Sequence, residues 1–128
     1  MRLLIDTHAL LWWLDGNRKL SVAARRAIED SEGTVFVSSA SGWEIATRYR
    51  IGKLPLGERL HGRLSEAIAE QGFESLAISF ELARIAGNLP GQHGDPFDRI
   101  LAAQAVCENL VLVTRDERIR EFGSRTLW

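Results

Sequence analysis

This sequence has little cysteine, little lysine and no long apolar run. The only cysteine, Cys107, leaves no partner for an internal disulfide and too few thiols for a cysteine-based zinc site. No apolar run approaches the roughly 18 residues of a transmembrane helix, and the first residues lead into a predicted strand instead of a basic and apolar leader. We therefore expect no membrane segment and a cytoplasmic location.

An excess of charge of one sign is also lacking. Sixteen basic and seventeen acidic side chains give a net charge of -1, so no bulk positive field would hold a polyanion. Lysine occurs only as Lys19 and Lys53. Most basic side chains are arginines, whose planar guanidinium groups favour paired contacts to phosphate or carboxylate. Any nucleic-acid site must therefore be local.

What the sequence does contain is an alternation of strand and helix signals. The 128 residues, 45% of them hydrophobic, can cover both faces of a small sheet. Strands are predicted at 2–5, 34–37, 76–78 and 110–114, with an edge strand near 126–128. Helices are predicted at 7–14, 22–30, 42–51, 58–71, 80–88, 96–108 and 117–122. This order indicates one α/β domain over residues 1–128 with a mainly parallel central sheet.

Two acidic residues follow strands of this sheet. Asp6 comes directly after the first strand, and Asp116 lies two residues beyond the strand at 110–114. Because the carboxyl ends of parallel strands share the edge of a sheet where ligands bind, we expect both carboxylates there. A carboxylate after a buried strand is costly to desolvate unless it is paired, hydrogen-bonded or bound to a metal. An arginine partner, such as Arg99 or Arg115, is the alternative for Asp6.

Two further acids occupy the first turns of predicted helices. If Ser41 and Asp95 are the N-caps, Glu44 and Asp98 are each third in their helix, and both could turn toward the same edge. Carboxylate oxygens are the ligands that Mg²⁺ and Mn²⁺ prefer. Four acids at one edge therefore predict a divalent metal site.

Each acid also has an ordinary structural explanation, and these alternatives stay open. The segment from Ser41 to Glu44 matches a capping box, in which the glutamate binds only a backbone N–H. Asp95 and Asp116 could be plain N-caps. Asp98 could interact only with the helix dipole.

Four segments resemble the motifs of PIN-domain ribonucleases. They are, in chain order, 3–12 (LLIDTHALLW), 38–45 (SSASGWEI), 95–105 (DPFDRILAAQA) and 112–116 (LVTRD). Within that family they are most similar to the VapC-like toxins of bacterial toxin–antitoxin pairs. The match spans nearly the whole chain in the right order, and segment 95–105 is its most specific part.

The resemblance implies a three-layer α/β/α domain that gathers acids around one or two Mg²⁺ or Mn²⁺ ions. Asp6, Glu44 and Asp98 take the places of the three core acids, and Asp116 that of a more variable fourth. Asp95 either holds a metal-bound water or only caps its helix. The implied activity is hydrolysis of RNA phosphodiester bonds by a metal-dependent endoribonuclease whose carboxylates hold the metal. The implied partners are RNA, a second copy in a homodimer, and a small antitoxin protein that blocks the acidic site.

Other side chains are expected around the acids. Thr7 and Thr114 adjoin ligand positions, where their hydroxyls could support a carboxylate or a water, or where they could simply fill strand positions. His8 is expected to pack on Trp12, and His61 to face solvent. Candidate RNA contacts, which could equally be solvated or ion-paired, are Arg48, Arg50, Lys53, Arg99, Arg115 and His93.

Two other classes of function are weighed. A phosphoacceptor receiver domain would need paired acids after its first strand and a late lysine, but Thr7 follows Asp6 and no lysine lies beyond Lys53. A non-catalytic interaction module, whose metal-stabilised acidic pocket binds partners without cutting, stays open because catalysis depends on sub-ångström placement.

Overall fold

The central feature of the fold is one parallel sheet. A computed structural model describes residues 1–54, 58–92 and 94–128. The strands in these ranges are β1 (Leu3–Ile5), β2 (Val35–Ser38), β3 (Glu74–Leu76), β4 (Val111–Val113) and β5 (Arg125–Leu127). Their order is β3-β2-β1-β4-β5, and every neighbouring pair is parallel. The predicted parallel sheet is confirmed, and β1 lies at its centre.

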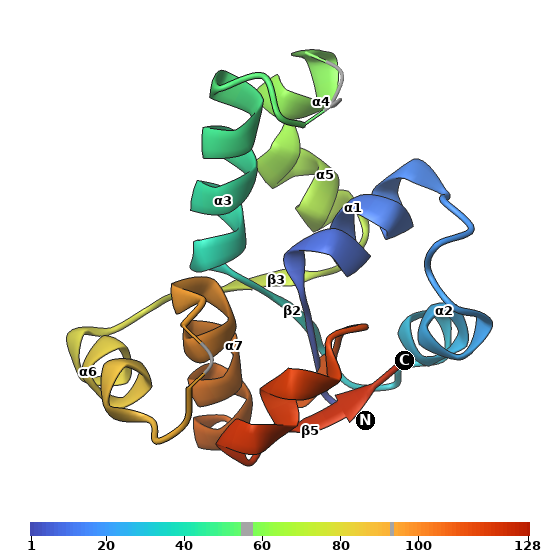
Figure 1. Ribbon diagram of the computed structural model, residues 1–128. Helices are drawn as coiled ribbons and strands as arrows, with labels where there is room; N and C mark the ends of the chain where they lie inside the picture. Colours follow the sequence, from blue (N-terminus) through green and yellow to red (C-terminus); the bar gives the residue numbers. More distant parts are fainter. Residues whose placement is uncertain (55–57, 93) are drawn as a thin grey trace.

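Helices cover both faces of this sheet. Those in the described ranges are α1 (Thr7–Asp15), α2 (Val22–Glu29), α3 (Ser39–Arg50), α4 (Glu58–Gly62), α5 (Leu64–Glu70), α6 (Phe80–Asn88), α7 (Pro96–Cys107) and a 3-10 helix, η1 (Glu117–Phe122). Residues of α1, α2 and α3 pack on one face, and residues of α7 and η1 on the other, with α6 against α7 (Figure 1). This arrangement confirms the predicted three-layer α/β/α fold. None of these helices has the length and hydropathy to cross a bilayer.

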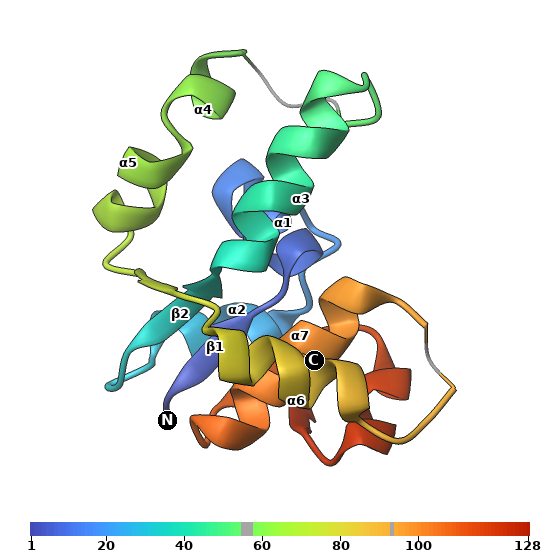
Figure 2. The same cartoon turned by 90° about the vertical axis from the view of Figure 1, so that its left-hand side faces the viewer.

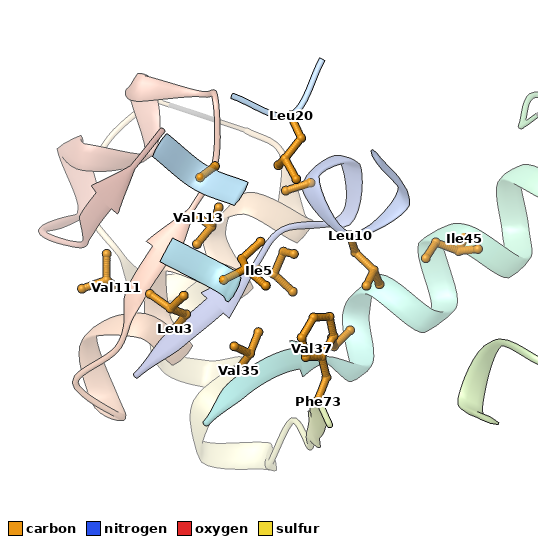
Figure 3. Packing of buried hydrophobic residues seen from close by; sticks show 13 residues of the cluster. Leu3, Ile5, Leu10, Leu20, Val35, Val37, Ile45, Phe73, Val111 and Val113 are labelled. Carbon is orange, nitrogen blue, oxygen red and sulfur yellow. The ribbon is translucent and has the colours of Figure 1, made fainter. Parts of the chain in front are cut away.

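Side chains of β1 alternate between the two apolar layers. Leu3 and Ile5 pack with Leu10 of α1 on one face, in the cluster drawn in Figure 3. Leu4 points to the other face and packs with Leu101 of α7. All three β1 side chains are fully buried, and burying each contributes about 1.5–3 kcal/mol. The carboxyl end of β1 is therefore held firmly in the middle of the sheet.

Helix α3 rises away from the sheet and carries α4 and α5 beside it, as both views of the molecule show (Figures 1 and 2). Tyr49 near the end of α3 stacks on His61 of α4, with ring centroids 3.9 Å apart and ring planes 12° from parallel. His61 is half-buried by this contact. The prediction that it faces solvent is therefore wrong.

Two predicted elements differ from the structure. The helix predicted at 58–71 is split into α4 and α5 because Arg63, after Gly62, leaves helical geometry (φ -124°, ψ 23°). The strand predicted at 76–78 lies two residues earlier, as β3. Ile78 does not join the sheet because it packs against the apolar cluster between α6 and α7.

Candidate functional site

Asp6 follows β1 and caps α1 at the carboxyl edge of the sheet. Its carboxylate accepts hydrogen bonds from the backbone N–H of Ala9 (2.8 Å) and from the Thr114 hydroxyl. Its own backbone N–H donates to the carbonyl of Val113 in β4 (3.1 Å). Burial raises the pKa of the Asp6 carboxyl, although these hydrogen bonds and nearby His8 oppose the rise. The ionised carboxylate is therefore under-compensated in this position.

Glu44 reaches the same edge from the second turn of α3. The N-cap of α3 is Ser38, so the predicted cap Ser41 is wrong, and with it the capping-box explanation of Glu44. The error arises because several serines compete for the start of this helix. Glu44 is only 8% exposed and forms an ion pair with Arg48 one turn later, with Nη2 and Oε2 2.9 Å apart.

Asp95 and Asp98 arrive on the first turn of α7. Asp95 is its N-cap, as predicted, and Oδ1 accepts from the backbone N–H groups of Phe97 (2.9 Å) and Asp98 (3.3 Å). Pro96 occupies the first helical position, where its missing N–H costs no hydrogen bond. The half-buried Asp98 is thereby held near the start of the helix.

Asp116 caps η1 just beyond β4. Its Oδ1 accepts from the Arg118 backbone N–H (3.0 Å), and its two carboxylate oxygens hold the Arg118 guanidinium at 3.0 and 2.9 Å. The Asp116 N–H donates to the Thr114 hydroxyl oxygen (3.1 Å). Because Thr114 also bonds the Asp6 carboxylate, it links the acids that follow β1 and β4.

One cavity of about 200 Å³ brings the predicted acids together. It is lined by Asp6, Thr7, His8, Glu44, Arg48, Asp95, Phe97, Asp98, Leu101, Asp116 and Arg118. Five of these side chains are carboxylates and two are arginines. The pKa of Arg118 is raised by Asp116 and, more weakly, by the charges of Asp98 and Asp95. The cavity therefore has more acids than cations.

The donor set of this cavity fits a divalent metal. Carboxylate oxygens are the ligands that Mg²⁺ and Mn²⁺ prefer, and the raised pKa of Asp6 reflects a charge without sufficient compensation. Among the described residues, however, no three Asp, Glu, His or Cys side chains converge closely enough to hold an ion as they stand. Glu44 and Asp116 would have to exchange Arg48 and Arg118 for the metal.

A second cavity, of about 290 Å³, adjoins the first and shares three of its residues. It is lined by Asp6, His8, Trp12, Arg115 and Asp116. The Arg115 guanidinium lies over the Trp12 ring, 4.9 Å from its centroid, so this predicted RNA contact lies beside the acids. His8 packs near Trp12 as predicted, with ring centroids 5.8 Å apart. It is nevertheless exposed, and its Nε2 lies 3.4 Å from Arg48 Nη1.

Arg99 has contacts outside these cavities. Its guanidinium donates to the carbonyls of Leu89 (2.7 Å) and Gly91 (2.9 Å), and it lies over the Phe122 ring, 5.1 Å from the centroid. These contacts tie the segment after α6 to α7. They fit a structural role better than the predicted contact with RNA.

The remaining predicted residues are distributed differently. The buried Thr7 hydroxyl donates to Ser41 Oγ (2.9 Å) and so joins α1 to α3, while its side chain also lines the acidic cavity. Arg50 and Lys53 are exposed at and beyond the end of α3, and neither lines the two cavities described. His93 lies outside the described residues.

Two residues of the acidic cavity that can carry a positive charge were missed by the reasoning from sequence. His8 lies two positions after Asp6, and Arg118 two positions after Asp116. Both acids cap a helix, so the second residue after each falls in the first helical turn at the same edge. That spacing is the signal by which these residues could have been found.

Comparison with known proteins is consistent with this geometry. A family model described as PIN domain matches residues 3–124. Ribonuclease VapC22 of Mycobacterium tuberculosis is 32% identical over 118 residues, which cover 91% of this chain and 88% of that protein.

Two solved structures share the fold at low identity. VapBC2 from Rickettsia felis bound to a promoter DNA fragment has a TM-score of 0.72 at 18% identity, covering 99% of this chain and 98% of that chain. FitAcB from Neisseria gonorrhoeae has a TM-score of 0.64 at 21% identity, covering 98% and 96%. The chain therefore belongs to the PIN-domain family.

Proposed function

We propose that this chain is a metal-dependent endoribonuclease that hydrolyses RNA phosphodiester bonds and acts as the toxin of a toxin–antitoxin pair. The observation that carries the proposal is a cavity where five carboxylates from four segments of the chain lie together. The PIN-domain match and the relative named as a ribonuclease support the same chemistry.

In the proposed mechanism the acids hold the metal and do not attack the substrate. Asp6, Glu44, Asp98 and Asp116 would hold one or two Mg²⁺ or Mn²⁺ ions. A bound ion of this kind lowers the pKa of a water toward neutrality and stabilises negative charge on phosphate oxygens. Thr114 orients the Asp6 carboxylate through its hydroxyl. Such support of a ligand by a neighbouring hydrogen bond typically matters 10- to 100-fold for metal affinity or activity.

Cations around the acids would bind the substrate. Arg48 and Arg118 are ion-paired to carboxylates, and on release they could bind phosphate oxygens through paired N–H groups. Arg115 and His8 line the adjoining cavity and extend this cationic rim. Asp95 would keep its role as a helix cap and could also hold a metal-bound water.

The proposed partners are RNA, a second copy of the chain, and a small antitoxin that blocks the acidic cavity. Solved structures of similar fold are described as VapBC2 and as a toxin–antitoxin complex. These descriptions support an antitoxin partner. We propose a cytoplasmic location for this activity.

The test is cleavage of labelled RNA by the purified chain with Mg²⁺ or Mn²⁺ and with chelator. We expect cleavage only with metal, and none from Asp98→Asn with an unchanged circular dichroism spectrum. Asp15→Asn is the matched control, because Asp15 is exposed at the far end of α1. Full activity of Asp98→Asn would mean that the site is misplaced, and cutting in chelator that the metal is not required.

A non-catalytic interaction module is the second candidate function. It is favoured by the ion pairs of Arg48 and Arg118, which already occupy two of the acids, and by the lack of a converged triad among the described residues. This candidate predicts metal-dependent binding of a partner with every RNA left intact. The same cleavage assay separates the two functions.

A further inference from the structure

An aromatic pair lies at the rim of the acidic cavity. Trp43 in the first half of α3 and Phe97 in the first turn of α7 have ring centroids 5.5 Å apart and planes inclined by 34°. Figure 1 shows the sheet-proximal end of α3 beside the start of α7. Two elements of the acidic site therefore also present their aromatic side chains together.

Trp43 is unusual among the tryptophans of this chain because it is exposed. Its side chain and backbone together are 61% exposed, whereas Trp12 and Trp13 pack partly buried against the main apolar cluster. Neither Trp43 nor Phe97 belongs to the apolar clusters found among the described residues. Core packing therefore does not account for a large aromatic ring at this position.

The pair borders a hollow that is continuous with the acidic cavity. This hollow, of about 350 Å³, is lined by Trp43, Glu44, Thr47, Arg48, Asp95, Pro96 and Phe97. Glu44, Arg48, Asp95 and Phe97 also line the acidic cavity. A group resting on Trp43 would therefore lie beside the acids, with the Arg48 guanidinium next to any attached phosphate.

We propose that Trp43, lying against Phe97, is a stacking platform for an unpaired RNA base next to the phosphodiester that is cut. This inference rests on the proposed ribonuclease function and specifies its substrate as single-stranded at that nucleotide. The flat face of any base can stack on an indole, whereas bases inside a duplex are already stacked and withheld. The platform thus selects single-stranded RNA over duplex RNA and tolerates many base sequences.

A nucleic-acid occupant fits this surface better than an apolar protein segment. The lining of the hollow combines two aromatic rings with an arginine, the proposed metal ligand Glu44 and the helix cap Asp95. A nucleotide brings both a flat ring for Trp43 and a phosphate for the cationic and metal groups. An apolar segment would leave the charges of Arg48, Glu44 and Asp95 desolvated without a matching partner.

The test is the affinity for a labelled single-stranded oligoadenylate, measured by fluorescence anisotropy in the presence of Mg²⁺. The protein carries Asp98→Asn throughout, so that the RNA stays uncut. We expect Trp43→Ala to weaken binding about tenfold, which is about 1.4 kcal/mol and within the range for loss of one stacked base. Trp43→Phe should restore most of the affinity, and an RNA duplex should bind Asp98→Asn with and without Trp43→Ala alike.

Phe80→Ala is the matched control, because Phe80 is 87% exposed on α6 and lines none of the three cavities described. It should leave binding unchanged. Unchanged single-strand affinity in Trp43→Ala would overturn the platform. So would a loss that is equal for duplex and accompanied by a smaller mass in light scattering, because Trp43 would then serve a contact between copies. Binding needs no cleavage, so failure of the wild type to cut RNA would count only against the ribonuclease proposal.

Discussion

The two ends of the parallel sheet use charge in different ways. At the amino end, Arg2 donates to the carbonyl of Glu108 (3.0 Å) and Arg125 to the side-chain oxygen of Asn109 (2.9 Å). Both arginines are bonded to neutral oxygens, and they tie the segment before β4 to β1 and β5. At the carboxyl end, five carboxylates share a cavity with two arginines.

This difference in charge pairing indicates which end of the sheet lowers the stability of the folded protein. At the amino end, the two arginines have partners that complete the fold. At the carboxyl end burial raises the pKa of Asp6, so an excess of negative charge is kept although it destabilises the metal-free protein. Such an unresolved mismatch is typical of functional sites, where natural proteins give up stability.

The largest effect is expected from Asp6→Asn. Asparagine keeps the cap of α1, because it is as good an N-cap as aspartate, but it removes the partly desolvated charge. We expect cleavage to fall by more than about 100-fold, the upper range for residues that only support a ligand. In chelator the melting temperature should rise, and Mn²⁺ should no longer stabilise the protein through the term RT ln(1 + [L]/Kd).

The pH dependence of this gain has a defined sign. The folded-state pKa of Asp6 lies above its ordinary value of 3.8, so the wild type loses stability as pH rises from 3.8 through the folded pKa. The advantage of Asp6→Asn in chelator should therefore be full only above the folded-state pKa and shrink as pH falls toward 3.8. Thermal melts at several pH values measure it. An advantage that grows on acidification would contradict the assignment of Asp6 as a half-buried acid whose ionised form is destabilised.

A smaller effect is expected from Arg118→Ala. Arg118 forms an ion pair with Asp116 in the metal-free protein. Removing the Arg118 side chain should therefore strengthen Mn²⁺ binding, measured by calorimetry. Roughly a two- to fivefold gain is expected, because the pair is exposed and solvent screens it. Arg120→Ala is the control, since Arg120 lies on the same short helix as Arg118, donates to the Thr126 hydroxyl of β5 and lines no acidic cavity described here. Weaker metal binding in Arg118→Ala would show that the arginine assists the metal instead of competing with it.

The smallest effect is expected at the amino end of the sheet. Arg2→Ala removes the hydrogen bond to Glu108 and the contact over the Phe36 ring, whose centroid is 5.5 Å away. We expect a loss of about 0.5–1 kcal/mol in unfolding free energy, measured in urea, because both contacts are exposed. Cleavage of RNA should not change. A clear loss of activity would break the distinction between the two ends.

The sequence predicted the fold well because its strand signals are simple. The apolar residues of β1 and β4 are each followed within three positions by an acid, and parallel strands bring their carboxyl ends to one edge. Asp6 and Asp116 could therefore be placed from spacing alone. The start of α3 could not, since Ser38 and Ser41 are equally good caps by residue type. Glu44 was predicted at the correct edge of the sheet, although the N-cap from which its position was argued was wrong.

Contacts between distant segments were beyond what spacing could reveal. Arg48 reaches both Glu44 and His8, and the second partner lies 40 positions away. Arg99 adjoins a predicted ligand in sequence, yet its guanidinium points to the carbonyls of Leu89 and Gly91. The position of an arginine guanidinium group depends on tertiary packing, because the long side chain can extend in several directions.

The backbone hydrogen bond from Asp6 to Val113 has a consequence for when the protein becomes active during its synthesis. The first acid of the chain is hydrogen-bonded to β4, a strand that the ribosome makes roughly 100 residues later. A nascent chain that lacks β4 lacks the hydroxyl of Thr114 and the carboxylate of Asp116 as well. The toxin proposed here would therefore lack a complete acidic site, and so stay harmless, until β4 and the acid that follows it have been made.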